Sequence, residues 1–392
     1  MKIFVIGTRG FPDIQGGVEQ HCENLYPRLA ANKCFITVFR RKPYIANRHR
    51  ISNSIRFIDL ISTRISGFEA FFHSFLSTIT CLLSKHPDIV HIHNIGPGFF
   101  MPLLKLFGLK VILTYHSPNY EHKKWNLSAK WFLRLSEVIS LWFADKIIFV
   151  SEQQMKKFPA FQQKSIWIPN GIREPKFVIQ KEISYLNKYY IHPKSYILFV
   201  GRLTPEKGVD VLLKAFNKIK TKKKLVIAGA ADNNEAYYDS LTRIAGISSQ
   251  VVFTGFVTGY ELFCLYKNAH FFVLPSFNEG NPIVMLEAMS YGLPVVASDI
   301  AANKEIKLPS KSYFPTGDVE ALAKKLDEMI HNEANVEHYD LNRYNWENIT
   351  QQTLETYKAI LAENKQKPSG TGNLKGRRKR KTPWKPAPAL SS

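Results

Sequence analysis

Short apolar runs alternate with longer helical patterns through most of this chain, and this alternation most constrains its fold. Six runs lie in the first half and five in the second, each almost continuously apolar, as is typical of strands covered on both faces. Strands separated by helical segments pair in parallel through βαβ units. The sequence therefore predicts an α/β fold with two doubly wound, Rossmann-like parallel sheets. The predicted strands span residues 2–7, 34–39, 55–60, 88–93, 110–116 and 146–151, then 196–201, 224–229, 251–256, 271–276 and 294–298.

Length and local pattern place the domain boundaries. At 392 residues the chain is about twice the usual domain size, which favours two domains. Residues 171–194 show no strong periodicity and are predicted to link an N-terminal domain, 1–170, to a C-terminal domain, 195–343. Ligands of such sheets bind beyond the carboxyl ends of the strands, so a cleft between the domains would receive loops from both. Residues 344–363 predict a helix that crosses back to the N-terminal domain, with an apolar face formed by Trp346, Ile349, Leu354, Tyr357 and Leu361.

The net charge of +21 is unevenly distributed. Residues 364–392 hold nine Lys and Arg and no acid, which leaves +12 on the rest of the chain. This tail is rich in Lys, Pro, Gly and Ser, and we expect it to be disordered because it cannot bury enough apolar surface. Two interpretations stay open. The tail is either solvated, or it makes peripheral contact with anionic membrane lipid, where each basic residue near the surface contributes roughly 1 kcal/mol of binding free energy. Nucleic acid is not predicted as a partner, because the basic excess is concentrated in the tail and nucleic-acid-binding signatures are absent.

The sequence predicts a cytoplasmic protein, at most associated with the inner face of the cytoplasmic membrane. A single lysine precedes the first apolar run and a glycine turn follows it, which fits a strand better than a signal peptide. The longest apolar region, 68–83, is interrupted by Glu69 and His73 and is too short to cross a bilayer. Four widely spaced cysteines without a CxxC pair predict buried thiols and no disulfide in a reducing compartment. They are Cys22, Cys34, Cys81 and Cys264.

Two glutamates flank a predicted helix start in FNEGNPIVMLEAMSYGLPVVASD. Pro282 suits the first helical turn, so Glu279 would lie in the loop after a strand and Glu287 about 7 to 8 Å along the helix axis. Free backbone amides at such a helix start favour an anionic ligand. The two carboxylates would then contact one extended ligand at two points. Spacing alone equally allows a surface glutamate and a capping turn.

A second candidate site follows the strand at 196–201. In VGRLTPEKG, Gly201 ends the strand, Arg202 comes next, and Lys207 precedes another helix. A guanidinium and an ammonium five residues apart in a βα loop suit paired phosphates. An exposed basic loop is the alternative.

The remaining motifs are weaker. The turn GTRGFPDIQGGVEQ lacks the spacing of a dinucleotide or P-loop motif, but Gly16 and Gly17 allow close approach of a ligand. His91 and His93 share one strand face without an evident third metal ligand, which favours a packed or cleft-lining role over a metal site. His122, beside two lysines, is either a contact for an anionic acceptor or part of a solvated loop.

In combination, EGNPIVMLE, VGRLTPEKG, the GGVE loop and PVVASD resemble the retaining GT-B glycosyltransferases of family 4, also called glycosyl transferases group 1. The resemblance covers roughly residues 1 to 362. The opening GTRGFPDIQGGVEQ is similar to a subset that builds bacterial surface polysaccharides.

The resemblance implies a role for each matching residue. Arg202 and Lys207 would bind the diphosphate of a nucleotide sugar, Glu287 the ribose, and Glu279 the transferred sugar. His116 matches a histidine that approaches the donor sugar, although the family more often has an acid where Ser117 follows here. The implied catalytic residues are thus Glu279, His116, Arg202 and Lys207. The other implied donor contacts are Gly16, Gly17, Gly201, Phe256, Val257, Gly280, Asn281, Pro282 and Ile283, with the base near Phe256 and Val257.

The implied reaction transfers a sugar from a nucleoside diphosphate sugar to a hydroxyl of a saccharide or lipid-linked saccharide, with retained configuration. No cofactor or metal is expected; the sequence contains no Asp-x-Asp, with which GT-A transferases hold a cation. Three alternatives remain. They are a GT-B sugar-nucleotide epimerase, a non-catalytic sugar-binding homologue, and a basic protein that binds nucleic acid.

Overall fold

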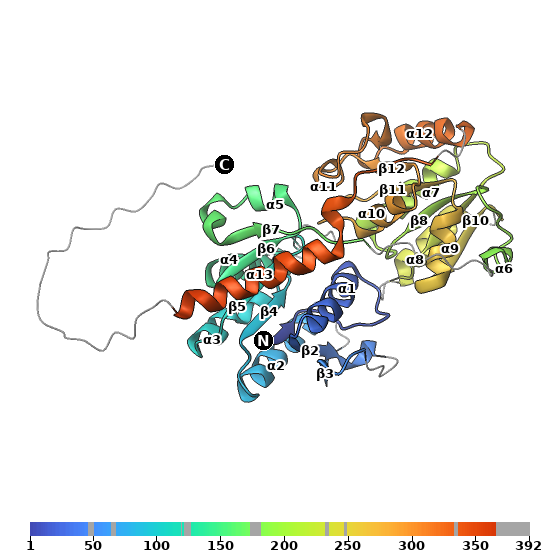
Figure 1. Cartoon of the computed structure of the whole chain (residues 1–392). Helices are drawn as coiled ribbons and strands as arrows, with labels where there is room; N and C mark the ends of the chain where they lie inside the picture. Colours follow the sequence, from blue (N-terminus) through green and yellow to red (C-terminus); the bar gives the residue numbers. More distant parts are fainter. Residues whose placement is uncertain are drawn as a thin grey trace, which may run out of the picture.

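A computed structural model describes residues 1–45, 51–63, 68–118, 120, 127–172, 182–231, 235–246, 249–332 and 336–365. Two α/β domains lie side by side in it, each built on one parallel sheet (Figure 1). This arrangement confirms the predicted fold class. His122 and nearly all of the basic tail lie outside the described residues, so their predicted roles stay predictions.

The N-terminal sheet has seven strands in the order β3-β2-β1-β4-β5-β6-β7. All six predicted strands are present, and β7 is a short edge strand without an apolar run to reveal it. The strands are β1 (Lys2–Ile6), β2 (Phe35–Arg41), β3 (Ile55–Leu60), β4 (Ile89–His93), β5 (Val111–Tyr115), β6 (Lys146–Phe149) and β7 (Ser165–Trp167). The helices are α1 (Gly17–Ala31), α2 (Phe68–Leu83), α3 (Met101–Leu106), α4 (Leu127–Phe143) and α5 (Glu152–Lys156), and a 3-10 turn, η2 (Pro97–Phe100), precedes α3.

The C-terminal sheet has six strands in the order β10-β9-β8-β11-β12-β13. The five predicted strands are confirmed, and the two-residue edge strand β13 was not predicted. The strands are β8 (Tyr196–Val200), β9 (Lys224–Ala228), β10 (Val251–Gly255), β11 (Phe271–Leu274), β12 (Val295–Ser298) and β13 (Tyr313–Phe314). The helices are α6 (Glu182–Asn187), α7 (Val209–Phe216), α8 (Glu235–Ala245), α9 (Gly259–Asn268), α10 (Ile283–Ser290), α11 (Ala301–Lys304), α12 (Val319–His331) and α13 (Trp346–Lys365), with a 3-10 turn, η5 (Pro205–Lys207), before α7.

Helix α13 returns to the N-terminal domain, as predicted, and lies along α1 (Figure 1). Its Trp346, Ile349 and Tyr357 are buried in the core that α1 forms against one face of the sheet. Helices α2, α3 and α4 pack against the opposite face of the same sheet. The N-terminal domain is therefore covered on one side by segments from both ends of the described chain.

The predicted linker, residues 171–194, needs one correction. Helix α6 lies inside it, and Leu186 and Ile191 are buried in the core of the C-terminal domain. Leu186 and Ile191 stand in the short segment ISYLNKYYI, and the six-residue helix α6 is too short to give a strong periodicity in the sequence. The last part of the predicted linker is thus part of the C-terminal domain.

The four cysteines are buried and free, as predicted for buried thiols. Among the described residues, no helix is both long and apolar enough to span a bilayer.

Candidate active site

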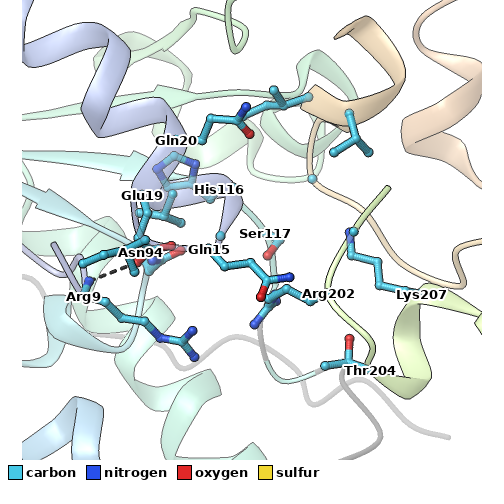
Figure 2. Close-up of a pocket in the computed structure, with 18 of the residues that line it drawn as sticks. Arg9, Gln15, Glu19, Gln20, Asn94, His116, Ser117, Arg202, Thr204 and Lys207 are labelled. Atoms are coloured by element: carbon cyan, nitrogen blue, oxygen red, sulfur yellow. Dashed lines mark hydrogen bonds between the residues drawn. The ribbon is translucent and has the colours of Figure 1, made fainter. Parts of the chain in front are cut away.

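A cavity of about 750 Å³ lies between the domains, at the carboxyl ends of both sheets. Figure 2 shows side chains of both domains around it, with Gln15 and Gln20 on one side and Arg202 and Lys207 on the other. Every residue that the resemblance implicated lines this one cavity. They are Gly16, Gly17, His116, Gly201, Arg202, Lys207, Phe256, Val257, Glu279, Gly280, Asn281, Pro282, Ile283 and Glu287.

Lys207 and Glu279 form an ion pair, with Lys207 Nζ 2.6 Å from Glu279 Oε1. Two features of the chain bring them together. Gly208, at φ +66°, immediately precedes α7, and a Cβ at this position would collide with the Pro275 carbonyl oxygen, so the loop before α7 lies against the loop after β11. Ser276 Oγ also donates to Glu279 Oε1, at 2.7 Å. The side chains of Lys207 and Glu279 are only 16% and 9% exposed, so the pair is largely shielded from bulk water.

Glu287 is buried in the cavity wall, not at the surface. Helix α10 begins at Ile283, directly after Pro282, and carries Glu287 one turn further into the domain. Tyr266 donates its hydroxyl hydrogen to Glu287 Oε2 at 3.2 Å, and Gln20 of α1 donates to Oε1 at 2.5 Å. One carboxylate therefore joins the two domains at the rim of the cavity.

The NEGNP loop also touches the N-terminal domain directly. A Cβ at Gly280 would collide with the carbonyl oxygen of His116, so only glycine allows this approach. The backbone N–H of Asn170 donates to Asn281 Oδ1 (3.2 Å), and the side-chain Nδ2 of Asn170 donates to the backbone carbonyl of Asn281 (3.1 Å). The side chain of Asn281 thus holds the domains together, a contact that the sequence did not predict.

Gly280→Ala should therefore widen the cleft, because the added methyl group pushes the loop away from His116. Small-angle scattering should show a larger radius of gyration than for the wild type. Gly96→Ala is the matched control, since at φ −57° its methyl group would meet only the Leu133 side chain, at 3.6 Å. Superimposable scattering curves for the wild type and Gly280→Ala would contradict the prediction.

Four buried histidines, His21, His91, His93 and His116, cluster beside the cavity, and of these four only His116 lines it. His93 Nδ1 lies 3.0 Å from His116 Nε2, and His93 Nε2 lies 2.6 Å from the Tyr26 hydroxyl. His91 stacks on His93 with ring centroids 4.4 Å apart, and its Nδ1 lies 2.6 Å from the Tyr357 hydroxyl of α13. Of the packed or cleft-lining role predicted for His91 and His93, the packed role is confirmed, because both are fully buried and neither lines the cavity.

Burial keeps these imidazoles neutral. It lowers the pKa of His21 from 6.5 to about 4, against a smaller opposing effect of the hydrogen bond with Asn170. Burial likewise lowers the pKa of His91 to about 3, and those of His93 and His116 well below 6.5. His116 can therefore offer a hydrogen bond at the cavity but not a positive charge.

No third ligand for His91 and His93 was evident in the sequence, but in the structure ligand nitrogens of His93, His21 and His116 lie within 4.8 Å of one another. Metal-bound imidazoles direct their nitrogens at an ion about 2.0–2.1 Å away. His93 and His116 instead direct theirs at each other, in the 3.0 Å contact. We interpret His93 and His116 as a hydrogen-bonded pair against which His21 packs its ring, with His21 Nδ1 bonded to Asn170 and His21 Nε2 buried without a hydrogen-bond partner among the described residues.

Comparison with known proteins identifies the class of the chain. The family model described as Glycosyl transferases group 1 matches residues 187–346, and the model described as Glycosyltransferase Family 4 matches residues 15–174. An uncharacterized glycosyltransferase of Methanocaldococcus jannaschii is 29% identical over 391 residues, covering 92% of this chain and 99% of the relative. The chain is a glycosyltransferase of the GT-B fold.

Solved structures agree on the fold. Sucrose-phosphate synthase from Thermosynechococcus elongatus superimposes with a TM-score of 0.79 at 22% identity, covering 92% of this glycosyltransferase and 99% of the synthase. The Anabaena protein HepE in complex with UDP-glucose gives a TM-score of 0.73 at 16% identity, with coverages of 92% and 100%.

Sequence reasoning missed several residues of the glycosyltransferase cavity. Glu19, within the GGVE loop, is turned inward and accepts from the Arg9 amide at 3.0 Å, which fixes the glycine-rich turn (Figure 2). Gln20 and Asn170 bridge to the other domain, and Tyr266, which does not itself line the cavity, orients Glu287. The GGVE motif could have identified Glu19 and the following Gln20 as site residues. No motif marks Asn170 or Tyr266 in the sequence.

Proposed function

We propose that this glycosyltransferase moves a sugar from a nucleoside diphosphate sugar to an acceptor hydroxyl, with retention of anomeric configuration. The observation that carries the proposal is the meeting of Arg202 and Lys207 with Glu279 and Glu287 in one cavity. Cations of this kind suit a diphosphate, and carboxylates accept hydrogen bonds from sugar hydroxyls. The similarly folded HepE binds UDP-glucose, which is consistent with such a donor.

In the proposed reaction, the bond from the anomeric carbon to the diphosphate oxygen breaks while a bond to the acceptor oxygen forms on the same face. The acceptor's proton passes to the departing diphosphate oxygen, so no enzyme nucleophile takes part. Lys207 and Arg202 stabilise the negative charge that develops on the leaving group. Because two side chains supply this charge, the proposed reaction needs no metal ion or other cofactor.

The cavity walls suggest how the donor is oriented. Glu279, held by Lys207 and Ser276, would accept from hydroxyls of the transferred sugar, next to the cation that meets the phosphates. Neutral His116 would add a hydrogen bond to the same sugar. Phe256 and Val257 line the cavity beyond the end of β10 and would pack against the base.

We further propose a saccharide or lipid-linked saccharide as the acceptor, in the synthesis of a surface polysaccharide. The N-terminal domain supplies the rest of the cavity, where the acceptor would enter. The predicted cytoplasmic location stays a prediction. The epimerase alternative has no specific observation in its favour.

A thermal-shift screen of nucleoside diphosphate sugars tests the proposal, because a donor that binds only the folded state raises the melting temperature. The donor that gives a shift is then incubated with acceptor saccharides, and the new linkage is examined by NMR. We expect the donor's anomeric configuration in the product. An inverted product would refute retention, and free epimerised donor without transfer would favour the epimerase.

Glu287→Gln should weaken donor binding more than it slows the chemical step, because we propose that Glu287 binds the ribose, away from the reacting bond. Loss of a hydrogen bond to a charged group costs about 1.5–3 kcal/mol, so the donor's KM should rise roughly 10- to 150-fold with little change in kcat. Initial rates over a range of donor concentrations measure both constants. Gln20→Ala removes the hydrogen bond that Glu287 accepts from the other domain but keeps the carboxylate, so it is the control. A kcat that falls as steeply as kcat/KM would place Glu287 in the chemical step instead.

A further inference from the structure

Helix α4 exposes an apolar face to solvent. Leu127, Trp131, Leu135, Val138 and Trp142 follow one another at intervals of three or four residues, which places them on one side of the helix. All five are exposed, with Leu127 at 86% and each of the two tryptophans at 68%. A soluble protein rarely exposes a continuous apolar stripe of this kind without a binding role.

The charges of α4 are segregated. Arg134 lies on the exposed face, and Lys130 is half-buried beside it. The helix's one acid, Glu137, faces inward and accepts a hydrogen bond from the Tyr115 hydroxyl at 2.5 Å. The outer face of α4 therefore carries apolar and basic side chains and no acid.

A cluster of phenylalanines extends this face to α2. Phe71 of α2 contacts Phe100 and Phe132 with ring centroids 5.1 and 5.6 Å apart, and Phe99 contacts Phe132 at 5.0 Å. Phe68, in the first turn of α2, is exposed. Helices α2 and α4, joined through η2, thus present one surface on the side of the sheet away from α13.

This surface reaches the opening of the cavity. Phe71, Ala129, Phe132 and Leu133 line the cavity together with the polar residues of the proposed donor site. One end of the cavity therefore has these apolar side chains beside the Arg41–Glu69 ion pair, and it borders the exposed first turns of α2 and α4. A ligand could extend from the polar end to this face without leaving protein contact.

We propose that α4 and the phenylalanine cluster form a membrane-docking face, which seats the end of the cavity beside α2 and α4 on an anionic bilayer. Tryptophan side chains favour the interface between lipid headgroups and acyl chains, and basic side chains without neighbouring acids favour anionic lipid. The chain's net charge of +21 has the complementary sign. The lipid of the acceptor stays in the bilayer while its sugar enters the cavity; this last step rests on the proposed function.

Vesicle co-sedimentation of the full chain tests the docking face. The vesicles contain phosphatidylcholine with about one third phosphatidylglycerol, and 0.5 M NaCl suppresses electrostatic binding by the basic tail. We expect the wild type to bind and the double variant Trp131→Ser/Trp142→Ser to partition at least about tenfold less, because two large apolar side chains no longer enter the interface. Tyr190→Asn, which removes an 82% exposed aromatic ring from the C-terminal domain, should bind like the wild type.

Wild-type binding by the double variant, or no wild-type binding at high salt, would overturn the docking face. So would a dimer that the double substitution dissociates in analytical ultracentrifugation, since the face would then bind a second copy of the chain. The melting temperature of each variant, with and without donor, is measured in parallel. Loss of vesicle binding with an intact donor-induced shift isolates the docking face, whereas a wild type that binds vesicles but no donor would refute only the proposed function.

Discussion

Lys207→Ala should lower kcat for sugar transfer by about 10²- to 10³-fold at saturating donor, the usual effect of removing one group that stabilises developing negative charge. The lysine is fixed by Glu279 at 2.6 Å and largely shielded from bulk water, so its charge acts through a medium that screens it weakly. The Lys207 side chain does not have to move into position during the reaction, because the Gly208 turn and the loop after β11 already hold it beside Glu279. Single-turnover rates with saturating donor measure the effect on the chemical step directly.

Lys214→Ala is the matched control for Lys207→Ala. Lys214 lies in the last turn of α7, the helix that follows the same loop, and its side chain is half exposed. The substitution Lys214→Ala removes one positive charge from the same domain and should leave kcat unchanged. The melting temperature of Lys207→Ala must stay near that of the wild type for the comparison to hold. A kcat within threefold of the wild type for folded Lys207→Ala would remove Lys207 from the proposed mechanism.

Glu279→Gln separates the two members of the ion pair. It keeps the shape of the side chain and an acceptor oxygen for Ser276, but it removes the charge that holds Lys207. If Lys207 depends on Glu279 for its position, the fold-loss of kcat in the double variant Lys207→Ala/Glu279→Gln should be smaller than the product of the fold-losses in the two single variants.

The sequence predicted the parts of the cavity that depend on local pattern. Lys207, Glu279 and Glu287 stand at fixed offsets from strands and helix starts, so a parallel α/β fold places them at one end of a sheet. The strands that escaped prediction, β7 and β13, are short edge strands with little buried surface. Strands of three and two residues are too short to form an apolar run, whereas the other two edge strands, β3 and β10, are longer and were predicted.

Contacts between the domains could not be predicted. Gln20 and Glu287 are 267 positions apart, and Asn170 and Asn281 are 111 apart. Such pairs leave no periodic signal, because each residue is an ordinary polar side chain in its own segment. The histidine cluster is a similar case: His21, His93 and His116 belong to separate βα units and meet only because β1, β4 and β5 are neighbours in the sheet.

The buried histidines should make the protein unstable in mild acid. In the folded state burial holds the pKa of His21 at about 4 and those of His73 and His91 at about 3, whereas an exposed histidine in the unfolded chain has a pKa near 6.5. Between these values the unfolded state binds more protons, so the free energy of unfolding falls as the pH falls. The full stability is present above pH 6.5, and each such histidine removes about 1.4 kcal/mol per pH unit below it.

Urea unfolding at pH 7.5, 6.5, 5.5 and 5.0 should therefore give a free energy that is nearly constant at the first two values and drops steeply at the others. His73→Gln removes one of these groups away from the cavity, and its slope below pH 6 should be shallower by about 1.4 kcal/mol per pH unit. His86→Gln removes an exposed histidine and controls for the substitution itself. A free energy of unfolding that stays flat from pH 7.5 to 5.0 would mean that water or local opening reaches these imidazoles in the folded state, because only shielding from solvent keeps their protons off.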